Sequence, residues 1–228
     1  MSARAPWLMW VRVVRLQEAF LAELERLQPS LCVTAAYGNM LPRRFLATPK
    51  HCTLNIHPSL LPLYRGAAPV NRCLQAGDSE TGVSLAFTVL ACDAGPVLAQ
   101  RRVPLDGDEQ TPELLQRLFS EGAEMLVEAL PRVWTAAAAA EAAAQDDAAA
   151  TAAPKMAKGD AELDFSQPAE TLHNKVSPSC ALQGQVCWHV LHLQLGDRVC
   201  RCAALRAGPA RRRLFALWSQ ARRTRSSP

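Results

Sequence analysis

The stretch CTLNIHPSLLPLYRGAAPVNR, residues 52–72, carries the pattern that decides the fold of this chain. Its first five residues, 52–56, are a short and largely apolar run, which is typical of a buried strand in a parallel sheet. Asn55 and His57 lie two residues apart at the end of that strand, so both side chains leave the same face of the sheet. Open α/β folds place their ligand crevice at the carboxyl ends of strands, and both residues are therefore candidates for a functional site.

The segments on both sides of this stretch extend the pattern to an α/β fold. In chain order, the predicted elements are a helix that ends before Pro29, a strand at 31–36, the strand at 52–56, a helix at 67–77, strands at 82–90 and 97–105, and a helix at 111–134. Apolar residues at helical spacing and terminal Pro or Gly indicate the helices, and continuous apolar runs indicate the strands. This order predicts a mainly parallel sheet whose last two strands turn back on each other.

The composition is that of a globular protein with unevenly distributed charge. Hydrophobic residues make up 49% of the 228 residues, which is enough to build a core. Residues 1–154 hold 13 Lys and Arg against 16 Asp and Glu, a balance of −3, whereas residues 155–228 hold 12 against 5, a balance of +7. The basic end suits an anionic partner such as nucleic acid, or is a solvated tail.

The eight cysteines indicate a reducing compartment rather than a disulfide framework, because they form no CxxC pair and follow no regular spacing. The tightest group of potential metal ligands, between Cys187 and Cys202, matches no common zinc pattern, so no metal site is predicted. No apolar run reaches the roughly 18 residues that a membrane-spanning helix requires, so no membrane contact is predicted.

A carboxylate completes a set of residues that suits chemistry. Asp93 lies in the turn LACDAGP (90–96), 36 residues after His57. A single histidine at a strand end is more often structural, and an Asp in a turn usually binds backbone groups. An amide donor beside a titratable imidazole, with a carboxylate available, instead suits a reaction in which charge develops and protons move. On the residues alone, both interpretations stay open.

Four ordered motifs resemble those of the folate-dependent formyltransferases. They are TAAYGNMLP (34–42), NIHPSLLPLYRGAAPVNR (55–72), GDSETGVSLAF (77–87) and LACDAGPVL (90–98). Agreement in order and spacing over more than 60 residues is far more specific than a lone short pattern. The run SLLPLYRGAAP is similar to the members that act on methionyl-tRNA, and the motifs look most like the organellar enzymes of plants and green algae.

The resemblance implies transfer of a formyl group from 10-formyltetrahydrofolate to the α-amino group of methionine on initiator tRNA, a step of translation initiation. In that reaction an amine attacks the formyl carbon, and negative charge develops on the formyl oxygen. Asn55 would donate a hydrogen bond to that oxygen. His57 would donate to the same oxygen or supply a proton to the leaving nitrogen, while Asp93 would hold the imidazole and help remove the amine proton.

Further site residues follow from the resemblance alone. Positions in the loop after the central strand match the folate site, two positions after the first strand match the neighbourhood of the pterin, and one arginine matches a position near the tRNA acceptor end. The competing interpretations are loop packing and, for the arginine, a solvated surface. The residues that match the folate site are Ser59, Leu60, Leu61 and Pro62. Met40 and Leu41 match the neighbourhood of the pterin, and Arg65 matches the position near the tRNA acceptor end.

The resemblance also predicts the domain organisation. The family begins with further βα units before the AYG strand, so the Rossmann-like sheet is expected to be incomplete at its N-terminus. Residues 154–176 match the approach to a small β-rich tRNA-binding domain, and the family pattern is lost after Val176. The predicted segments are an atypical start (1–17), the catalytic domain (18–134), an alanine-rich linker or solvated helical spacer (135–153), and a partial, divergent β-rich C-terminal segment with a basic tail (154–228).

Several alternatives remain at this level. One alternative is a shortened, non-catalytic form or fragment of such an enzyme. A second is another 10-formyltetrahydrofolate-dependent transferase, and a third is a nucleic-acid binder that uses the basic and aromatic tail at 211–225. The Arg-containing, amphipathic start resembles an organellar transit peptide, which predicts a mitochondrial or plastid location. A monomer is expected.

Overall fold

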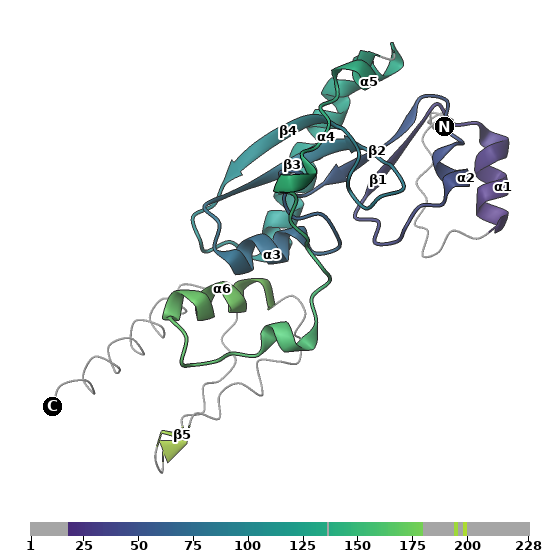
Figure 1. Cartoon of the computed structure of the whole chain (residues 1–228). Coiled ribbons are helices and arrows are strands. Elements are labelled where there is room, and N and C mark those ends of the chain that lie inside the picture. The colour runs from purple at the N-terminus through teal and green to yellow at the C-terminus, as the bar shows by residue number, and fades with distance from the viewer. Residues whose placement is uncertain (1–17, 136, 180–193, 196–197, 200–228) are drawn as a thin grey trace, which may run out of the picture.

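The computed structural model describes residues 18–135, 137–179, 194–195 and 198–199 (Figure 1). The interpretations of residues 1–17, of the Cys187–Cys202 group and of the basic tail therefore lie outside the described residues. The elements are α1 (Glu18–Leu27), β1 (Leu31–Ala35), α2 (Arg43–Leu46), β2 (Cys52–His57), α3 (Pro69–Ala76), β3 (Glu80–Phe87), β4 (Val97–Pro104), α4 (Thr111–Trp134), α5 (Ala137–Glu141), the 3-10 turns η1 (Asp147–Ala149) and η2 (Lys158–Ala161), α6 (Ala169–Ser179), β5 (Gln194–Leu195) and β6 (Arg198–Val199).

The predicted α/β fold with an open sheet is confirmed. Four strands lie in the order β1-β2-β3-β4, and β1 is parallel to β2. The next two pairings are antiparallel, so within the described sheet parallel pairing is confined to its beginning. The expected turn-back of the last two strands is the β3–β4 pair. Of the β-rich segment expected near the C-terminus, the described part is the two-residue antiparallel pair β5–β6.

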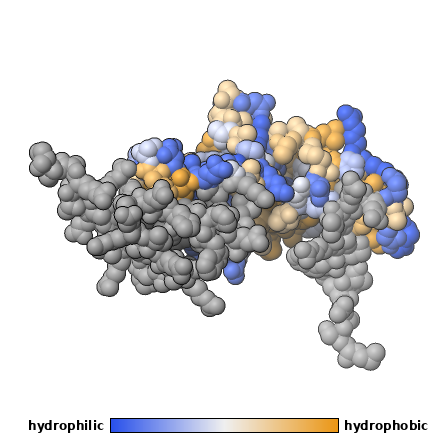
Figure 2. Space-filling model, turned by 90° about the horizontal axis from the view of Figure 1, so that it is seen from below, coloured by the Kyte–Doolittle hydropathy of each residue, from blue (hydrophilic) through white to orange (hydrophobic). Residues whose placement is uncertain are grey.

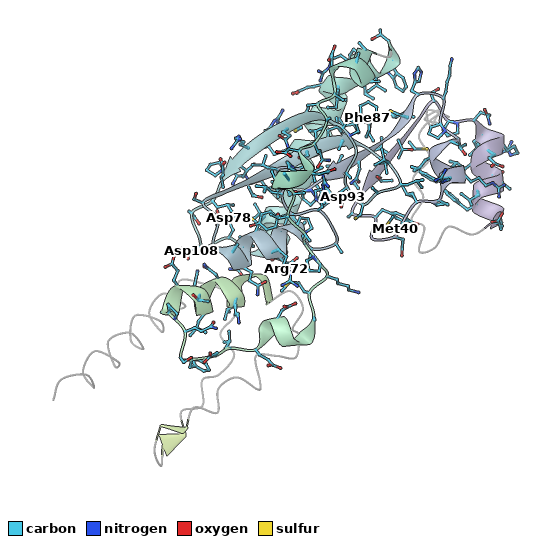
Figure 3. The ribbon with its side chains drawn as sticks, in the orientation of Figure 1. Met40, Arg72, Asp78, Phe87, Asp93 and Asp108 are labelled. Carbon is cyan, nitrogen blue, oxygen red and sulfur yellow. The ribbon has the colours of Figure 1, made fainter. Side chains whose placement is uncertain are left out.

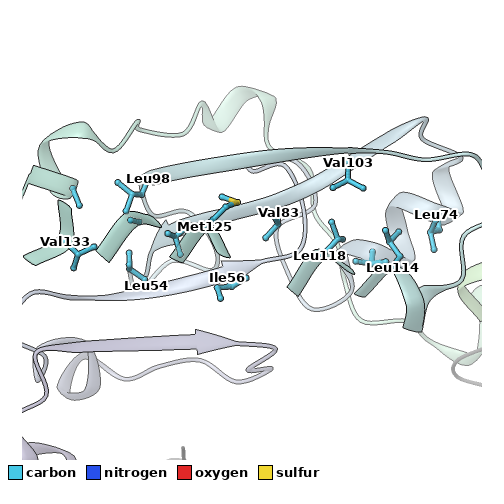
Figure 4. Packing of buried hydrophobic residues seen from close by; sticks show 14 residues of the cluster. Leu54, Ile56, Leu74, Val83, Leu98, Val103, Leu114, Leu118, Met125 and Val133 are labelled. Atoms are coloured by element: carbon cyan, nitrogen blue, oxygen red, sulfur yellow. The ribbon is translucent and has the colours of Figure 1, made fainter. Parts of the chain in front are cut away.

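The two faces of β2 have opposite characters because side chains alternate along a strand. Leu54 and Ile56 are 0% and 5% exposed and point into the main core, which α4 covers (Figure 4). Leu118 on α4 is also fully buried in this cluster. Burial of an aliphatic side chain contributes about 1.5–3 kcal/mol, so the apolar face of β2 against α4 holds the sheet together.

The opposite face carries polar residues on all four strands, in two short rows. Thr34 on β1 lies beside Asn55 on β2. His57 lies beside Ser84 on β3, which in turn lies beside Gln100 on β4. Because these residues alternate with those that face α4, a strand period of two places both polar rows on the side of the sheet away from that helix.

Two local features depart from the sequence-based expectation. The segment after β1 was expected to be a turn around Pro42, but it contains the short helix α2, which begins directly after Pro42. Phe45 of α2 is buried against Leu21 and Leu24 of α1, so this packing stabilises a helix too short to show a clear period. The helix predicted at 67–77 begins at Pro69 and ends, as predicted, at a left-handed glycine, Gly77 (φ +77°).

The described part of the alanine-rich stretch is mostly exposed and begins with the short helix α5, but it is anchored to the domain at a few points. Ala138 and Ala153 are 2% and 0% exposed. Residues 142–153, named here the alanine strap, form backbone bridges between Ala143 and Val97 of β4 and between Ala152 and Arg65. Alanine contributes little apolar surface, but its small side chain allows the backbone to approach closely enough for these hydrogen bonds.

The segment that follows the alanine strap packs under α3. Figure 1 shows α6 running beneath α3, and the two helices are in contact. Arg72 on α3 donates to Asp160 at 2.9 Å, and neither side chain of this ion pair is more than 25% exposed. Residues 169–176, predicted as helical, lie within α6, which extends to Ser179.

The described surface mixes polar and apolar residues, with hydrophilic patches alternating with smaller hydrophobic ones on the face seen in Figure 2. Val33 on the outer strand β1 is 42% exposed, and Val127 on α4 is 65% exposed. Among the described residues, no helix combines the length and apolar character needed to cross a membrane.

Candidate active site

The loop between β3 and β4 brings Asp93 back over the polar face of the sheet (Figure 3). Asp93 has a left-handed backbone (φ +48°), a conformation that Asp tolerates better than most residues. Gly95 allows the turn to close, because a Cβ at that position would lie 1.8 Å from the carbonyl oxygen of Phe87. The backbone of the DAG turn therefore fixes where this carboxylate points.

The predicted trio converges on one atom, the Oδ1 of Asp93. Asn55 donates to it from Nδ2 at 3.3 Å, and the Nδ1 of His57 lies 3.7 Å from it. The Oδ1 of Asn55 accepts a bond from the Thr34 hydroxyl at 2.9 Å, which orients the amide so that its NH2 group faces the carboxylate. The structure thus brings together three residues separated by up to 38 positions.

His57 is held from both sides. Its side chain is 5% exposed, and Nε2 lies 3.0 Å from the carbonyl oxygen of Tyr64. Since a carbonyl oxygen can only accept, Nε2 carries a hydrogen in this arrangement, and Nδ1 is the nitrogen that faces Asp93. The ring is therefore oriented by its Nε2 hydrogen bond, while Nδ1 lies 3.7 Å from the carboxylate, too far for a direct hydrogen bond.

The second oxygen of Asp93 is anchored by the loop that follows β2. The backbone N–H of Gly66 donates to Oδ2 at 2.9 Å. Gly66 has φ +128°, and a Cβ there would lie 2.7 Å from the carbonyl oxygen of Ala153, so glycine is required at this close approach. The RGAAP motif thus places a backbone donor at the carboxylate, a role that the sequence analysis did not anticipate.

The residues matched to the folate site are arranged mainly by packing. Ser59 is fully buried, and its hydroxyl donates to the carbonyl oxygen of Leu63 at 2.6 Å. The Ser84 hydroxyl accepts from the N–H of Leu61 at 3.0 Å and donates to the carbonyl oxygen of Ser59 at 2.6 Å. The polar row that contains Ser84 therefore fixes the backbone of this loop, and the Ser59 side chain is already engaged within the protein.

A cavity of about 320 Å³ lies beside this loop. Leu61 and Pro62 form part of its wall, and β4 and the alanine strap form the remainder. Leu60 packs instead against the position of Gly82 on β3. Asn55, His57 and Asp93 do not line the cavity, but Gln145, which does, bonds to the backbone of Asp93 at 2.8 Å.

Met40 and Leu41 lie outside this cluster. Met40, which is labelled in Figure 3, lies on the loop after β1 and is 64% exposed. Leu41 is half-buried against the α1–α2 cluster that contains Phe45. Both follow the carboxyl end of β1, which is the neighbour of β2, but neither makes a described contact with Asp93.

Arg65 is not a solvated surface cation. Its side chain is 16% exposed and lies 2.8 Å from the carboxylate of Asp147. The guanidinium also donates to the side-chain oxygen of Gln145, from Nε at 3.0 Å and from Nη2 at 2.8 Å. Both partners lie in the alanine strap, so in this structure Arg65 anchors that segment.

Two residues near the carboxylate were missed by sequence reasoning. Thr34 lies within a quoted motif, but only the parallel register of β1 and β2 shows that it faces Asn55. Gln145 was passed over because it lies in a low-complexity segment. The available signal was the interruption of an alanine run by Gln145, Asp146 and Asp147, since polar residues in such a run require partners.

Cysteine reactivity gives a test of the local structure. Burial raises the pKa of the Cys73 thiol from 9.0 to about 12. Partial burial and the neighbouring Asp93 also raise the pKa of the Cys92 thiol, but this side chain is exposed to reagent. The folded state keeps the Cys73 proton between pH 9.0 and about 12 and the unfolded state releases it, so the Cys73 thiol makes stability fall as pH rises from about 9 towards 12. At about pH 8 we expect iodoacetamide to modify Cys92 well before Cys73, as measured by peptide mapping. In denaturant the two should react alike, and preferential folded-state labelling of Cys73 would contradict its burial.

An open α/β sheet with a partly buried Asn–His–Asp cluster at the end of its second strand defines a Rossmann-like α/β protein with a candidate polar site. The family model described as formyl transferase matches residues 9–130, more than half of the chain. The chain therefore belongs to the formyl transferase family.

Among curated proteins, the chain is 41% identical over 174 residues to the methionyl-tRNA formyltransferase of Thermus thermophilus, covering 76% of this chain and 55% of that protein. It is 46% identical over 151 residues to the protein of the same name from Roseiflexus castenholzii, covering 66% and 48%. The chain thus spans about half the length of the curated relatives it matches.

Solved structures agree in fold. HypX from Aquifex aeolicus, in complex with tetrahydrofolic acid, has a TM-score of 0.57 at 23% identity, covering 72% of this chain and 28% of that one. A sugar N-formyltransferase from a Shewanella species has a TM-score of 0.56 at 17% identity, covering 71% and 64%. These likenesses support the Rossmann-like α/β sheet.

Proposed function

We propose that this chain transfers a formyl group from 10-formyltetrahydrofolate to the amino group of methionyl-tRNA. The observation that carries the proposal is the convergence of Asn55 and His57 on the Oδ1 of Asp93. The identity of 41–46% to methionyl-tRNA formyltransferases favours this acceptor over the sugar acceptors named for some structural neighbours.

The chemistry requires charge stabilisation and two proton movements. The amine nitrogen attacks the formyl carbon, the carbonyl oxygen becomes negative, and the bond from that carbon to N10 of the folate then breaks. Asn55 Nδ2 is the proposed donor to the negative oxygen, a contribution that typically amounts to about 3–4 kcal/mol of barrier. Thr34 holds the other end of this amide, so the donor is oriented before substrate arrives.

His57 and Asp93 are the proposed proton carriers. A proton leaves the attacking amine as the new bond forms, and N10 must gain one as it departs. The carboxylate, anchored by the Gly66 N–H, accepts the amine proton directly or through water. His57 Nδ1, which faces the same carboxylate, takes that proton from Asp93 and delivers it toward N10, so both residues return to their starting protonation states.

For the donor, the proposal uses the loop that carries Ser59, Leu60, Leu61 and Pro62. The fully buried Ser59 fixes the loop, while Leu61 and Pro62 line a cavity of about 320 Å³. This volume lies at the lower end of the roughly 300–1,000 Å³ typical of ligand pockets, and because Asn55, His57 and Asp93 do not line the cavity, the proposal places only part of the donor there. The exposed Met40 and the adjoining Leu41 are proposed as flanking contacts for the pterin.

For the acceptor, Arg65 is the proposed contact near the tRNA end. Its guanidinium is engaged by Asp147, whose side chain is 84% exposed. Because the Asp147 side of this ion pair faces solvent, we propose that a phosphate displaces Asp147 while the bonds from Arg65 to Gln145 remain. The basic end of the chain, with a balance of +7 over residues 155–228 (12 basic residues less 5 acidic), adds general attraction for RNA.

The proposal extends to initiation in an organelle. The sequence motifs and the Arg-containing residues 1–17 are the support for a mitochondrial or plastid site, whereas the relatives described above are bacterial. The test is import into isolated organelles of a reporter fused to residues 1–17, compared with the same fusion carrying Arg4→Glu, Arg12→Glu and Arg15→Glu. We expect import of the first fusion and loss of import of the second.

The direct test is formylation of methionyl-tRNA by the purified 228-residue chain with 10-formyltetrahydrofolate. We expect formylmethionyl-tRNA to accumulate, with free methionine a much poorer acceptor because it lacks the tRNA contacts. Circular dichroism and sedimentation of the same sample should report a cooperatively folded monomer. A cooperatively folded chain that gives no product would contradict the proposal.

A further inference from the structure

Gln145 uses its whole amide group at the centre of the site. Its Nε2 donates to the carbonyl oxygens of Asp93 at 2.8 Å and Gly95 at 2.6 Å. Its Oε1 accepts two bonds from the Arg65 guanidinium, at 3.0 Å and 2.8 Å. A glutamine amide has two N–H donors and an oxygen with two lone pairs, so all four positions are occupied.

These bonds tie together three segments that meet at the carboxylate. Gln145 comes from the alanine strap, Arg65 from the loop after β2, and Asp93 from the turn between β3 and β4. The strap is itself fixed on either side of Gln145, by the Ala143–Val97 bridge and by the Ala152–Arg65 bridge. Gln145 is therefore held by backbone pairing at a fixed distance from the turn.

The two N–H groups of Gln145 donate to the part of the turn that directs the Asp93 side chain. The two carbonyl groups flank Ala94, and Asp93 itself has a left-handed φ of +48°. A left-handed non-glycine residue costs of order 1 kcal/mol and persists when surrounding contacts over-determine it. Within the described residues, Gln145 is the side chain that donates hydrogen bonds to both of these carbonyl groups.

We infer that Gln145 is a positioning residue for formyl transfer, which sets the Asp93 carboxylate against His57 and Asn55. The inference rests on the proposed function. It assigns a role to a side chain that lies in a stretch of alanines and touches none of the reacting groups. Its loss lets the turn relax, and a displacement of about 1 Å in such a site can cost about 100-fold in rate.

Two variants separate the roles of the amide. Gln145→Ala removes all four bonds, whereas Gln145→Glu keeps an acceptor for Arg65 and loses the donors to the Asp93 turn. The matched control is Gln75→Ala, because Gln75 also accepts from an arginine, Arg72 at 2.8 Å, but on α3. Both Gln145 variants should lower kcat about 10- to 100-fold with less change in the KM for 10-formyltetrahydrofolate, and Gln75→Ala should be unchanged.

A second readout does not depend on turnover. The imidazole ring resonances of His57, identified by their loss in His57→Asn, report the position of the facing carboxylate at 3.7 Å. They should shift in Gln145→Ala and in Gln145→Glu and stay in place in Gln75→Ala. If the unmodified chain gives no product, the proposed function fails and these resonances alone decide the role of Gln145.

The outcomes are distinct. Loss of kcat with shifted His57 resonances in both Gln145 variants, at unfolding midpoints like that of Gln75→Ala, supports positioning through the turn. A Gln145→Glu variant that behaves like the unmodified chain would overturn the inference, because the Arg65 contact would then suffice. Unchanged His57 resonances in Gln145→Ala would overturn it as well.

Discussion

Replacing Asp93 by alanine is expected to abolish measurable formyl transfer, with a loss of about 1,000-fold or more in kcat/KM. The substitution removes the carboxylate on which Asn55 and His57 converge, at 3.3 Å and 3.7 Å. It removes the proposed acceptor of the amine proton and the group that faces the imidazole, and acid–base groups typically contribute about 100- to 10,000-fold. His57→Ala should be similarly severe, since it deletes the proton donor. The measurement is steady-state formylation of methionyl-tRNA.

The controls for this prediction concern folding and charge. Asp93→Ala leaves the Gly66 N–H without its acceptor, which costs about 1–3 kcal/mol, so chemical denaturation should still show a cooperative transition at a lower midpoint. Asp106→Ala removes an acidic residue from an exposed loop and should leave turnover unchanged. Activity near that of the unmodified chain in either Asp93→Ala or His57→Ala would sink the roles assigned to the pair.

The fold and part of the site could be predicted from the sequence, because both depend on the short-range periodicity of apolar and polar residues along strands and helices. Alternation along 52–57 placed Asn55 and His57 on one face, and the structure shows Leu54 and Ile56 on the other. The helix at 111–134 was predicted with the bounds that α4 has, because its apolar residues follow the helical spacing over many turns. A long periodic segment can be predicted as a helix from its own residues, whereas α2 is a single turn that depends on packing against α1.

The rest of the site depends on contacts between distant segments that no local pattern encodes. Asp93 was associated with His57 through the family resemblance, and its approach depends on the close contact of Gly95 with Phe87. The anchoring of the alanine strap was not predicted, because alanine has neither amphipathic period nor large apolar surface. Its order comes from backbone pairing with β4 and Arg65, which becomes visible only when the chain is folded.

The position of the site on the sheet links stability to chemistry. Asn55 and His57 alternate with Leu54 and Ile56, so the apolar packing against α4 and the polar face share one strand. On α4, Gly122 lies so close to Ile56 that a Cβ would come within 2.3 Å of its Cγ2 atom. Because interiors are close-packed, a shift of α4 would move β2 and with it both proposed catalytic residues.

Leu118→Ala is accordingly the substitution with the largest expected effect on stability. Leu118 is 0% exposed in the core between α4 and the sheet. Truncating a buried leucine costs about 2–5 kcal/mol through lost transfer energy and the cavity left behind. A domain of this size is stabilised by only about 5–15 kcal/mol, so a large part of its stability should be lost in urea titrations.

The matched control is Val127→Ala on the same helix, where the side chain is 65% exposed and the change should stay within about 0.5 kcal/mol. Under conditions in which Leu118→Ala remains folded, we expect kcat to fall less than in Asp93→Ala, because every reacting group is still present. Equal losses of stability in Leu118→Ala and Val127→Ala would mean that α4 does not pack against the sheet through this face. Another element would then have to support β2 and, with it, the positions of Asn55 and His57.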